Sequence, residues 1–140
     1  MLNPTRTLAA DTTYMVTLTS AITAGKPLPV TTWSFTTGPR PTLAARTPGI
    51  NASHVARTAN VTIRFSEKVS AVSGTSLMLV TSTGRRVAAV VTYNRTTGVA
   101  TLNPTSSLSA RVRYTVVVTN AIKDRAGNRL TATRWSFTTA

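Results

Sequence analysis

The chain has 140 residues and a formal net charge of +13, with 16 Lys and Arg against three acidic residues, Asp11, Glu67 and Asp124. It contains no cysteine, which excludes disulfides, thiol catalysis and thiolate metal sites. It has no apolar stretch of the roughly 18 or more residues that a membrane-spanning helix needs, so we expect no insertion into a membrane.

The two ends of the chain repeat each other. Residues 2–22 and 102–122 are identical at 11 of 21 positions at a constant offset of 100, and the segment Trp33–Thr37 returns as Trp135–Thr139. A period of about 100 residues is the size of one small β-sandwich and exceeds the ~20–50 residues of solenoid repeats. The sequence therefore predicts a tandem array of domains, and the chain is expected to open within one of them.

This repeat divides the chain into three parts. Residues 1–38 form a partial repeat with C-terminal strands only, residues 39–46 are a linker, and residues 47–140 are a complete domain. Pro39 and Pro41 are expected to hold the linker extended and fairly stiff.

Short strands follow one another in both parts, because apolar and polar residues alternate over stretches of five to ten residues. The expected strands are 13–19 and 31–37 in the partial repeat, and 61–65, 77–80, 87–93, 99–102, 112–118 and 130–139 in the domain. Turns separate them at 83–84, 94–98 and 124–128, and Asn103-Pro104 is expected to end a strand. About seven short strands without a helical period predict an all-β, immunoglobulin-like antiparallel sandwich of two sheets.

Two aromatic positions refine this prediction. Tyr114 follows Leu108 by one loop at the start of the penultimate strand, where a tyrosine hydroxyl can bond back to the preceding backbone, and Leu8 and Tyr14 repeat the pattern. Leu108 would then be a core residue under the loop. The expected core contains Ile63, Phe65, Tyr114, Val116, Trp135 and Phe137.

Five motifs occur in a fixed order in the predicted domain. They are Thr47-Pro48-Gly49, Phe65-Ser66-Glu67-Lys68-Val69, Leu102-Asn103-Pro104, Asp124-Arg125-Ala126-Gly127-Asn128 and Ser136-Phe137-Thr138-Thr139. Together they resemble the bacterial Ig-like domain of the S-layer-protein type, over 47–140 in full and over 1–38 as a C-terminal part. The partial repeat departs from the pattern at 23–28, which lacks the Asp and Asn and is two residues shorter.

The resemblance implies a modest function. Such domains are tandem spacers and adhesive modules of secreted and surface-bound bacterial proteins, with no common activity or cofactor. We therefore expect an extracellular or cell-surface location, neighbouring Ig-like repeats as partners, and no enzyme activity.

Candidate catalytic and metal-binding residues are few. His54, the one histidine, lies in a polar loop without a nucleophile motif, so we expect an exposed loop residue rather than a catalytic base. Asp124 and Asn128 raise the question of calcium, but one acid among Lys123, Arg125 and Arg129 makes a poor cation site. Asp124 is instead expected to accept backbone N–H groups in its turn. Glu67 is expected to pair with Lys68 or a nearby arginine, or to cap a loop. We expect no cofactor, no metal site and no catalytic residue.

The basic residues concentrate in one part of the chain. Residues 1–38 hold two basic residues and one acid, whereas residues 39–140 hold 14 basic residues and two acids. Such a surface attracts polyanions, and nucleic acid, anionic cell-wall polymer and anionic lipid are all candidates, beside a soluble surface without a dedicated partner. The candidate polyanion contacts are Arg85, Arg86, Arg111, Arg113, Arg129 and Arg134.

The scarcity of free aromatic residues narrows this choice. Nucleic-acid modules usually interleave basic residues with exposed aromatic rings, and here only Tyr93 is expected to be free. We therefore expect no sequence-specific nucleic-acid binding. If the basic residues gather on one face, binding of an anionic polymer gains support, and if they scatter, the spacer function does.

The partial repeat suggests one further partner. Its apolar positions, which include Tyr14, Trp33 and Phe35, lack the opposite sheet of a complete repeat. An exposed apolar face and open strand edges favour pairing with another chain. The sequence therefore predicts a homodimer or larger assembly through residues 1–38, by pairing or by domain swapping.

Overall fold

The structure is a computed structural model that describes residues 3–21, 26–27 and 29–140. These residues form two compact units, Met1–Pro39 and Arg40–Ala140. Within the described residues, strands and turns are present and no helix is, which agrees with the all-β prediction. The described part has no helix that is long and apolar enough to cross a membrane. The strands are β1 Thr13–Leu18, β2 Thr31–Thr36, β3 Leu43–Thr47, β4 Val61–Phe65, β5 Val69–Ser70, β6 Leu77–Thr81, β7 Ala89–Asn94, β8 Val99–Pro104, β9 Arg113–Val118, β10 Lys123–Asp124 and β11 Thr133–Thr138.

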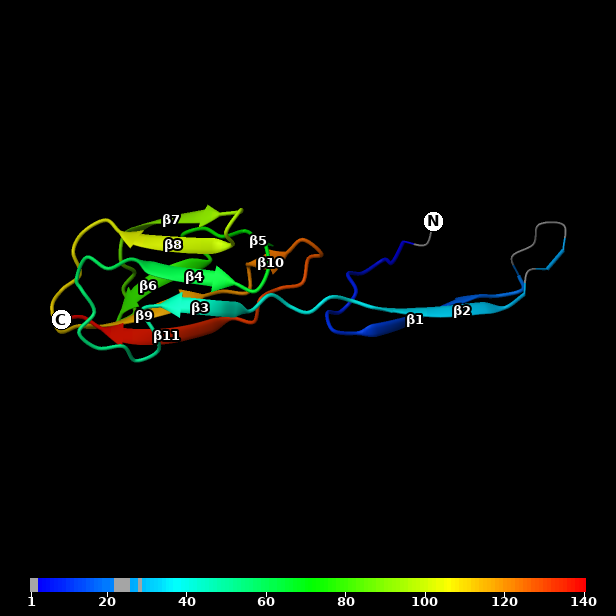
Figure 1. Ribbon diagram of the computed structural model, residues 1–140, viewed down its shortest axis with the longest axis horizontal. Coiled ribbons are helices and arrows are strands. Elements are labelled where there is room, and N and C mark those ends of the chain that lie inside the picture. The colour runs from blue at the N-terminus through cyan, green and yellow to red at the C-terminus, as the bar shows by residue number, and fades with distance from the viewer. Residues whose placement is uncertain (1–2, 22–25, 28) are drawn as a thin grey trace. The chain divides into compact units, whose positions relative to one another are not determined.

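The second unit is an antiparallel sandwich. One sheet has the order β3-β4-β8-β7 and the other has the order β11-β9-β6, and β5 and β10 form a small two-stranded ladder. Figure 1 shows this ladder at one end of the unit and the C-terminus at the opposite end. Because successive side chains of a strand point to opposite faces, each sheet turns its apolar positions inward. The buried apolar residues are Val61, Ile63, Phe65, Val69, Leu77, Leu79, Ala100, Leu102, Leu108, Tyr114, Val116, Val118, Ile122, Leu130, Trp135 and Phe137. All six expected core residues are among them.

The structure moves the start of the domain. Residues 39–46 were expected to be a linker, but Leu43–Thr47 forms β3 and pairs with β4 from Leu43↔Phe65 to Thr47↔Thr62. Pro41 is fully buried, so the chain already belongs to the sandwich before β3 begins. The alternation of buried and exposed side chains is weak in this edge strand, because a register shift between Leu43 and Ala45 interrupts its pairing with β4. The pattern that marks the other strands is therefore missing from its sequence.

Two smaller expectations also need correction. The strand that was expected to end at Asn103-Pro104 includes both residues, because Pro104 lies at the end of β8 opposite Ala89. Tyr93, expected to be free, packs edge-on against Phe65 with ring centroids 6.1 Å apart, and its hydroxyl accepts a hydrogen bond from the Val69 N–H at 3.1 Å.

The expected tyrosine contacts are present in both units. The Ser109 N–H donates to the Tyr114 hydroxyl at 3.0 Å, and the Ala9 N–H donates to the Tyr14 hydroxyl at 2.8 Å. Leu108 is buried beneath its loop, as predicted. The tyrosine therefore ties the start of its strand to the preceding connection, which is the tyrosine corner of immunoglobulin-like sandwiches.

The first unit is a two-stranded antiparallel hairpin. Strands β1 and β2 pair from Thr13↔Thr36 to Leu18↔Thr31, close to the expected strands 13–19 and 31–37. The Tyr14 and Phe35 rings stack with their centroids 5.9 Å apart. The expected short hairpin at 23–28 lies largely outside the described residues, since 22–25 and 28 are not described.

The hairpin reproduces the hydrogen bonds of β9 and β11 at matching positions. The Thr37 hydroxyl donates to the Ala9 carbonyl at 2.6 Å and accepts from the Thr12 N–H at 3.0 Å. In the second unit the Thr139 hydroxyl makes the same two bonds with Ser109 and Val112, also at 2.6 and 3.0 Å. Asp11 and Arg111 both adopt left-handed backbone, with φ of 51° and 56°. The sequence repeat is therefore also a repeat of local structure.

Candidate anion-binding site

The six arginines that the sequence singled out do not form one cluster. In the ladder of β9 and β11, Arg113 pairs with Thr138 at one end and Arg134 pairs with Val117 near the other. Arg111 lines an open cavity of about 370 Å³ beside Arg113's end of the ladder, together with Ser53, His54, Thr138, Thr139 and Ala140. The polyanion contacts predicted from sequence are thus divided between opposite ends of the sandwich.

Several of these arginines hold the backbone in place. The Arg86 guanidinium donates to the Gly74 carbonyl, and Arg129 donates to the Asn120 carbonyl at 3.1 Å. Arg113 donates to the Asn51 side-chain oxygen at 2.9 Å. Each of these side chains fastens two loops, or a loop and a strand, so part of the basic surface has a structural use.

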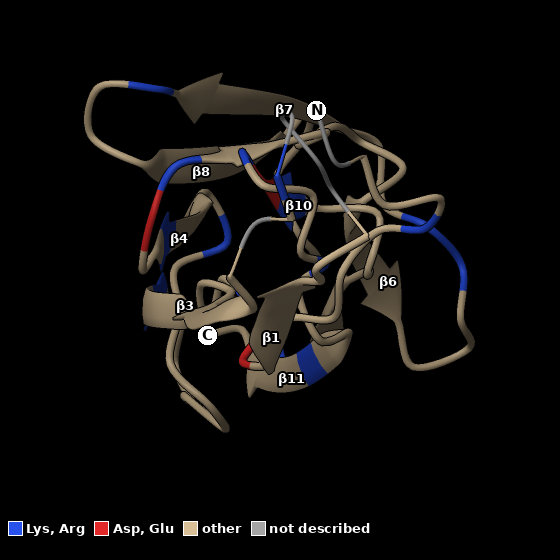
Figure 2. Cartoon of the chain, turned by 90° about the vertical axis from the view of Figure 1, so that its right-hand side faces the viewer, with Lys and Arg blue, Asp and Glu red and all other residues tan. Residues whose placement is uncertain are grey.

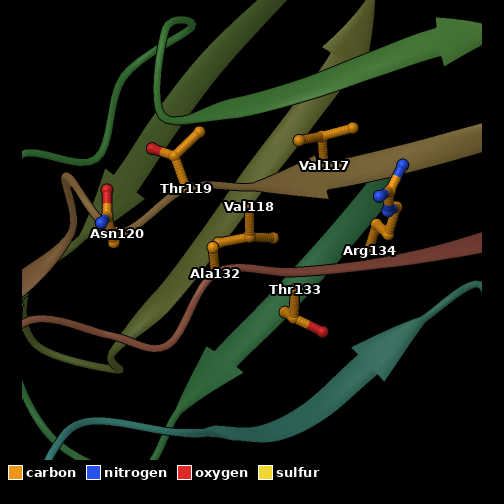
Figure 3. A pocket seen from close by; sticks show the side chains of 7 residues that line it. All are labelled: Val117, Val118, Thr119, Asn120, Ala132, Thr133 and Arg134. Atoms are coloured by element: carbon orange, nitrogen blue, oxygen red, sulfur yellow. The ribbon is translucent and has the colours of Figure 1, made fainter.

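A second cavity lies where β9 and β11 meet the neighbouring connections. It has a volume of about 540 Å³ and is lined by Val117, Val118, Thr119, Asn120, Ala132, Thr133 and Arg134. Figure 3 shows Arg134 beside Val117, its cross-strand partner, while the other lining residues are apolar or neutral. With Arg134 as its one charged lining residue, this cavity concentrates little positive charge.

The third cavity is different because three basic residues converge on it. Its volume is about 240 Å³, and Lys68, Arg95 and Arg125 line it together with Val69 and Ser70. The three basic residues are all exposed. They come from three separate connections at the end of the sandwich that carries β5 and β10. Figure 2 colours Lys and Arg blue and Asp and Glu red, and blue segments clearly predominate along the chain.

Hydrogen-bonded turns position two of these cations, Arg95 and Arg125. Arg95 lies in the β7–β8 hairpin, where the Asn94 side chain accepts the N–H groups of Thr96 and Thr97 at 2.9 and 3.1 Å. Gly98 completes this turn with a φ of 71°, a conformation that L side chains rarely adopt. The backbone of Arg95 is therefore held in place although its side chain is exposed.

The turn that carries Arg125 is held by a buried carboxylate. Asp124 accepts the Asn128 N–H and side-chain amide, each at 2.8 Å, and both residues are buried. Gly127 in the same turn has a φ of 95°. This arrangement is the turn function expected for Asp124.

The short ladder of β5 and β10 completes the cavity. It pairs Val69 with Asp124 and Ser70 with Lys123, and the Ser70 hydroxyl donates to the Lys123 carbonyl at 3.2 Å. This ladder brings Lys68 and Ser70 beside the turn that carries Arg125. The ladder thus joins two of the three connections that line the cavity, those of Lys68 and Arg125.

One carboxylate lies next to this cavity. Glu67 precedes Lys68 and is exposed. Desolvation, followed by the nearby carboxylate of Asp124, raises the pKa of Glu67 above its ordinary value. The surroundings of Glu67 therefore disfavour the charged form of its carboxyl group.

The structure places His54 in a loop beside Ser53. It is exposed, has a left-handed φ of 55°, and its Nδ1 lies 3.3 Å from the hydroxyl of its neighbour Ser53. Among the described residues no group of three or more His, Cys, Asp or Glu side chains is placed to hold a metal ion.

Comparison with known families agrees with this architecture. Residues 39–139 match the family of the bacterial Ig-like domain. The chain belongs to this family. No curated protein sequence matches the chain.

Solved structures share the fold of this Ig-like domain at low sequence identity. CopC from Methylosinus trichosporium OB3b is 22% identical with a TM-score of 0.60, over 71% of this chain and 92% of that one. The N-terminal part of the bacterial S-layer protein SbsC is 19% identical with a TM-score of 0.54, over 71% of this chain and 23% of that one. The LD transpeptidase LdtMt1 is 18% identical with a TM-score of 0.52, over 73% of this chain and 41% of that one. The Ig-like domain is thus a fraction of two of these chains.

Sequence reasoning did not single out the residues of the basic cavity in the Ig-like domain. Lys68, Arg95 and Arg125 each lie in a recognisable turn or motif, but nothing in the sequence says that the three turns meet. Their convergence depends on the pairing of β5 with β10 and on the position of the β7–β8 hairpin. Both are tertiary features, and a two-residue ladder leaves no pattern in a sequence.

Proposed function

We propose that the chain is a non-catalytic structural module of a secreted or cell-surface bacterial protein, in which Ig-like repeats of the S-layer type follow one another as spacers or adhesive units. The observation that carries this proposal is the second occurrence of the β9–β11 pattern in residues 3–38, with matching register and matching Tyr and Thr hydrogen bonds. A second occurrence of one structural pattern in a chain supports an array of repeats.

The relatives support the same function. The chain covers 23% of the N-terminal part of SbsC and 13% of a longer SbsC fragment. The matched domain is therefore a small part of that S-layer protein. The Ig-like domain here has its own core, which a spacer requires in order to fold beside any neighbour.

The test is independent folding of residues 40–140. We expect this fragment to unfold in one cooperative transition in denaturant, with coincident transitions by tryptophan fluorescence and circular dichroism. A matched fragment that starts at Thr47 lacks most of β3 and should be less stable. Force spectroscopy on a tandem of two 40–140 units should give one unfolding event per unit. Failure of 40–140 to unfold cooperatively would contradict the spacer function.

A second candidate function is the binding of an anionic polymer of the cell envelope. The specific observation is the cavity that Lys68, Arg95 and Arg125 line, with the Ser70 hydroxyl beside them. Guanidinium and ammonium groups that converge on one small cavity suit the phosphate, sulfate or carboxylate groups of such polymers. Binding would be electrostatic and without sequence or sugar specificity.

Salt dependence and matched variants test this second function. We expect heparin and DNA, used as probe polyanions, to bind residues 1–140 and to be released by salt. Replacing Lys68, Arg95 and Arg125 by Gln should flatten the slope of log K against log salt for duplex DNA by about 2–3. The control replaces Arg85, Arg111 and Arg134 by Gln, which removes the same charge from elsewhere on the sandwich. Equal losses in both variants, or strong binding in high salt, would contradict a site at the cavity.

A further inference from the structure

The hairpin of the first unit exposes residues whose counterparts are buried in the second unit. Trp33 and Phe35 are 48% and 42% exposed, whereas Trp135 and Phe137, at the matching positions of β11, are 4% and 1% exposed. Tyr14, Val16 and Leu18 share this face of the hairpin, because Tyr14 pairs with Phe35 and Val16 pairs with Trp33. The face therefore has the side chains of a sandwich core but no second sheet within the described unit.

The second unit shows what covers such a face. The apolar residues of β4 and β8, which include Val61, Ile63 and Leu102, complete one core cluster with Trp135 and Phe137. The indole N–H of Trp135 donates to the Pro48 carbonyl at 2.8 Å, and the Arg46 guanidinium lies 5.2 Å from the centre of its ring. The remaining edge of β9 pairs with β6 from Leu77↔Val118 to Thr81↔Tyr114. Nearly all of this cover comes from residues 40–102.

We propose that the β1–β2 hairpin is the docking surface for the N-terminal half of a bacterial Ig-like repeat, a polypeptide with the strand and side-chain pattern of residues 40–101. This partner would add a strand to the free edge of β1, as β6 does for β9, and lay a four-stranded sheet over Trp33 and Phe35. The inference rests on the repeat that also supports the proposed array, but it does not depend on whether the array is a spacer.

The alternative occupant is a second copy of the chain. Residues 1–140 contain two C-terminal hairpins, 1–38 and 102–140, but one N-terminal half, 40–101. Exchange of the N-terminal half between copies keeps two hairpins for every N-terminal half, so one hairpin per chain stays uncovered. The partner that completes both hairpins is therefore an additional N-terminal half. The homodimer expected from sequence becomes an outcome of the test.

The test supplies that additional half within the same polypeptide. A second copy of residues 40–101 is joined directly to Leu2, because Leu2-Asn3-Pro4-Thr5 matches Leu102-Asn103-Pro104-Thr105. The added segment contains no tryptophan, so the difference between this hybrid and its Trp33→Phe variant reports on Trp33 alone. We expect Trp33 emission to move to shorter wavelength and its quenching by acrylamide to fall toward that of Trp135. We also expect a second cooperative unfolding transition.

A matched control is a hybrid with Val61→Lys and Ile63→Lys in the added segment only. It has the same length and junction but cannot form the core, so Trp33 should stay exposed while residues 40–140 unfold as before. The inference is overturned if Trp33 in the unaltered hybrid remains as exposed as in residues 1–140. It is also overturned if light scattering shows residues 1–140 dimeric at about 100 µM with Trp33 already protected, since the occupant is then a second copy. Because residues 40–140 are assayed separately, failure of the hybrid does not count against the spacer function.

Discussion

Asp124 accepts two hydrogen bonds from Asn128, one from its backbone N–H and one from its side-chain amide, both at 2.8 Å. The two residues are buried at the base of the turn that carries Arg125. A carboxylate in this position accepts hydrogen bonds from two buried donors. The same pair therefore holds together the turn and one wall of the basic cavity.

Removal of this carboxylate should destabilise the domain. We expect Asp124→Ala to lower the free energy of unfolding of residues 40–140 by about 1–3 kcal/mol, because it removes the acceptor of two buried hydrogen bonds. The neighbouring control, Lys123→Ala, alters an exposed side chain and should stay within about 0.5 kcal/mol of the parent. Urea unfolding measures both. An Asp124→Ala effect as small as that of the control would show that the turn does not depend on the carboxylate.

Trp135 should contribute far more to stability than Trp33. We expect Trp135→Ala to cost about 3–5 kcal/mol in the unfolding of residues 40–140, since a large buried ring leaves a cavity. Trp135→Phe keeps a ring and loses the hydrogen bond to Pro48, so it should cost less. In residues 1–140, Trp33→Ala should leave this transition unchanged. A cost below about 1 kcal/mol for Trp135→Ala, typical of surface positions, would place the ring outside the core.

The hydroxyl oxygen of Tyr114 should contribute measurably to the stability of the domain. Tyr114→Phe removes the acceptor of the Ser109 N–H and keeps the ring contact with Phe137 at 6.0 Å. We expect a loss of about 1 kcal/mol, the usual net value of one hydrogen bond. Tyr14→Phe removes the matching bond of the first unit and should not change the unfolding of the second unit. Equal stability of Tyr114→Phe and the parent would show that the bond adds nothing.

Glu67 makes the stability of the domain depend on pH. Its folded-state pKa is raised above the ordinary value of 4.5, first by desolvation and then by Asp124, so the folded state binds its proton more readily than the unfolded state does. The stabilisation that comes from this tighter proton binding is fully present below about pH 4.5, the ordinary pKa, and is lost as pH rises through the folded-state pKa of Glu67. Glu67→Gln should therefore be more stable than the parent at pH 7 and should lose this advantage below the ordinary pKa.

Denaturant unfolding at several pH values tests this prediction. The matched control is Glu67→Ala, which removes the charge together with the side chain and separates charge from packing. If Glu67→Gln is less stable than the parent at pH 7, the carboxylate has a favourable partner, such as Lys68, and the expected direction is wrong. The same Gln variant should also bind polyanions more tightly, because it removes a negative charge beside the basic cavity.

Local features of the sequence were sufficient for most strands and for both tyrosine corners. Strand β4 coincides with the expected 61–65, and Tyr114 reaches Ser109, only five residues away, through a bond that one loop determines. Where apolar and polar residues alternate along a strand that lies between core and solvent, the sequence alone predicts the strand. The repeat of residues 2–22 at 102–122 likewise predicted matching local structure in the two units.

Contacts between distant segments could be decided only by tertiary structure. The strand β3 exists because it pairs with β4 some 20 residues later, and its own alternation is interrupted by the register shift after Leu43. Tyr93 is covered because Phe65 of β4 and Val69 of β5 contact it. Lys68, Arg95 and Arg125 line one cavity because three connections come to one end of the sandwich. The exposure of Trp33 and the burial of Trp135 follow the same principle, since the two residues share their local sequence and differ in the sheet that packs against them.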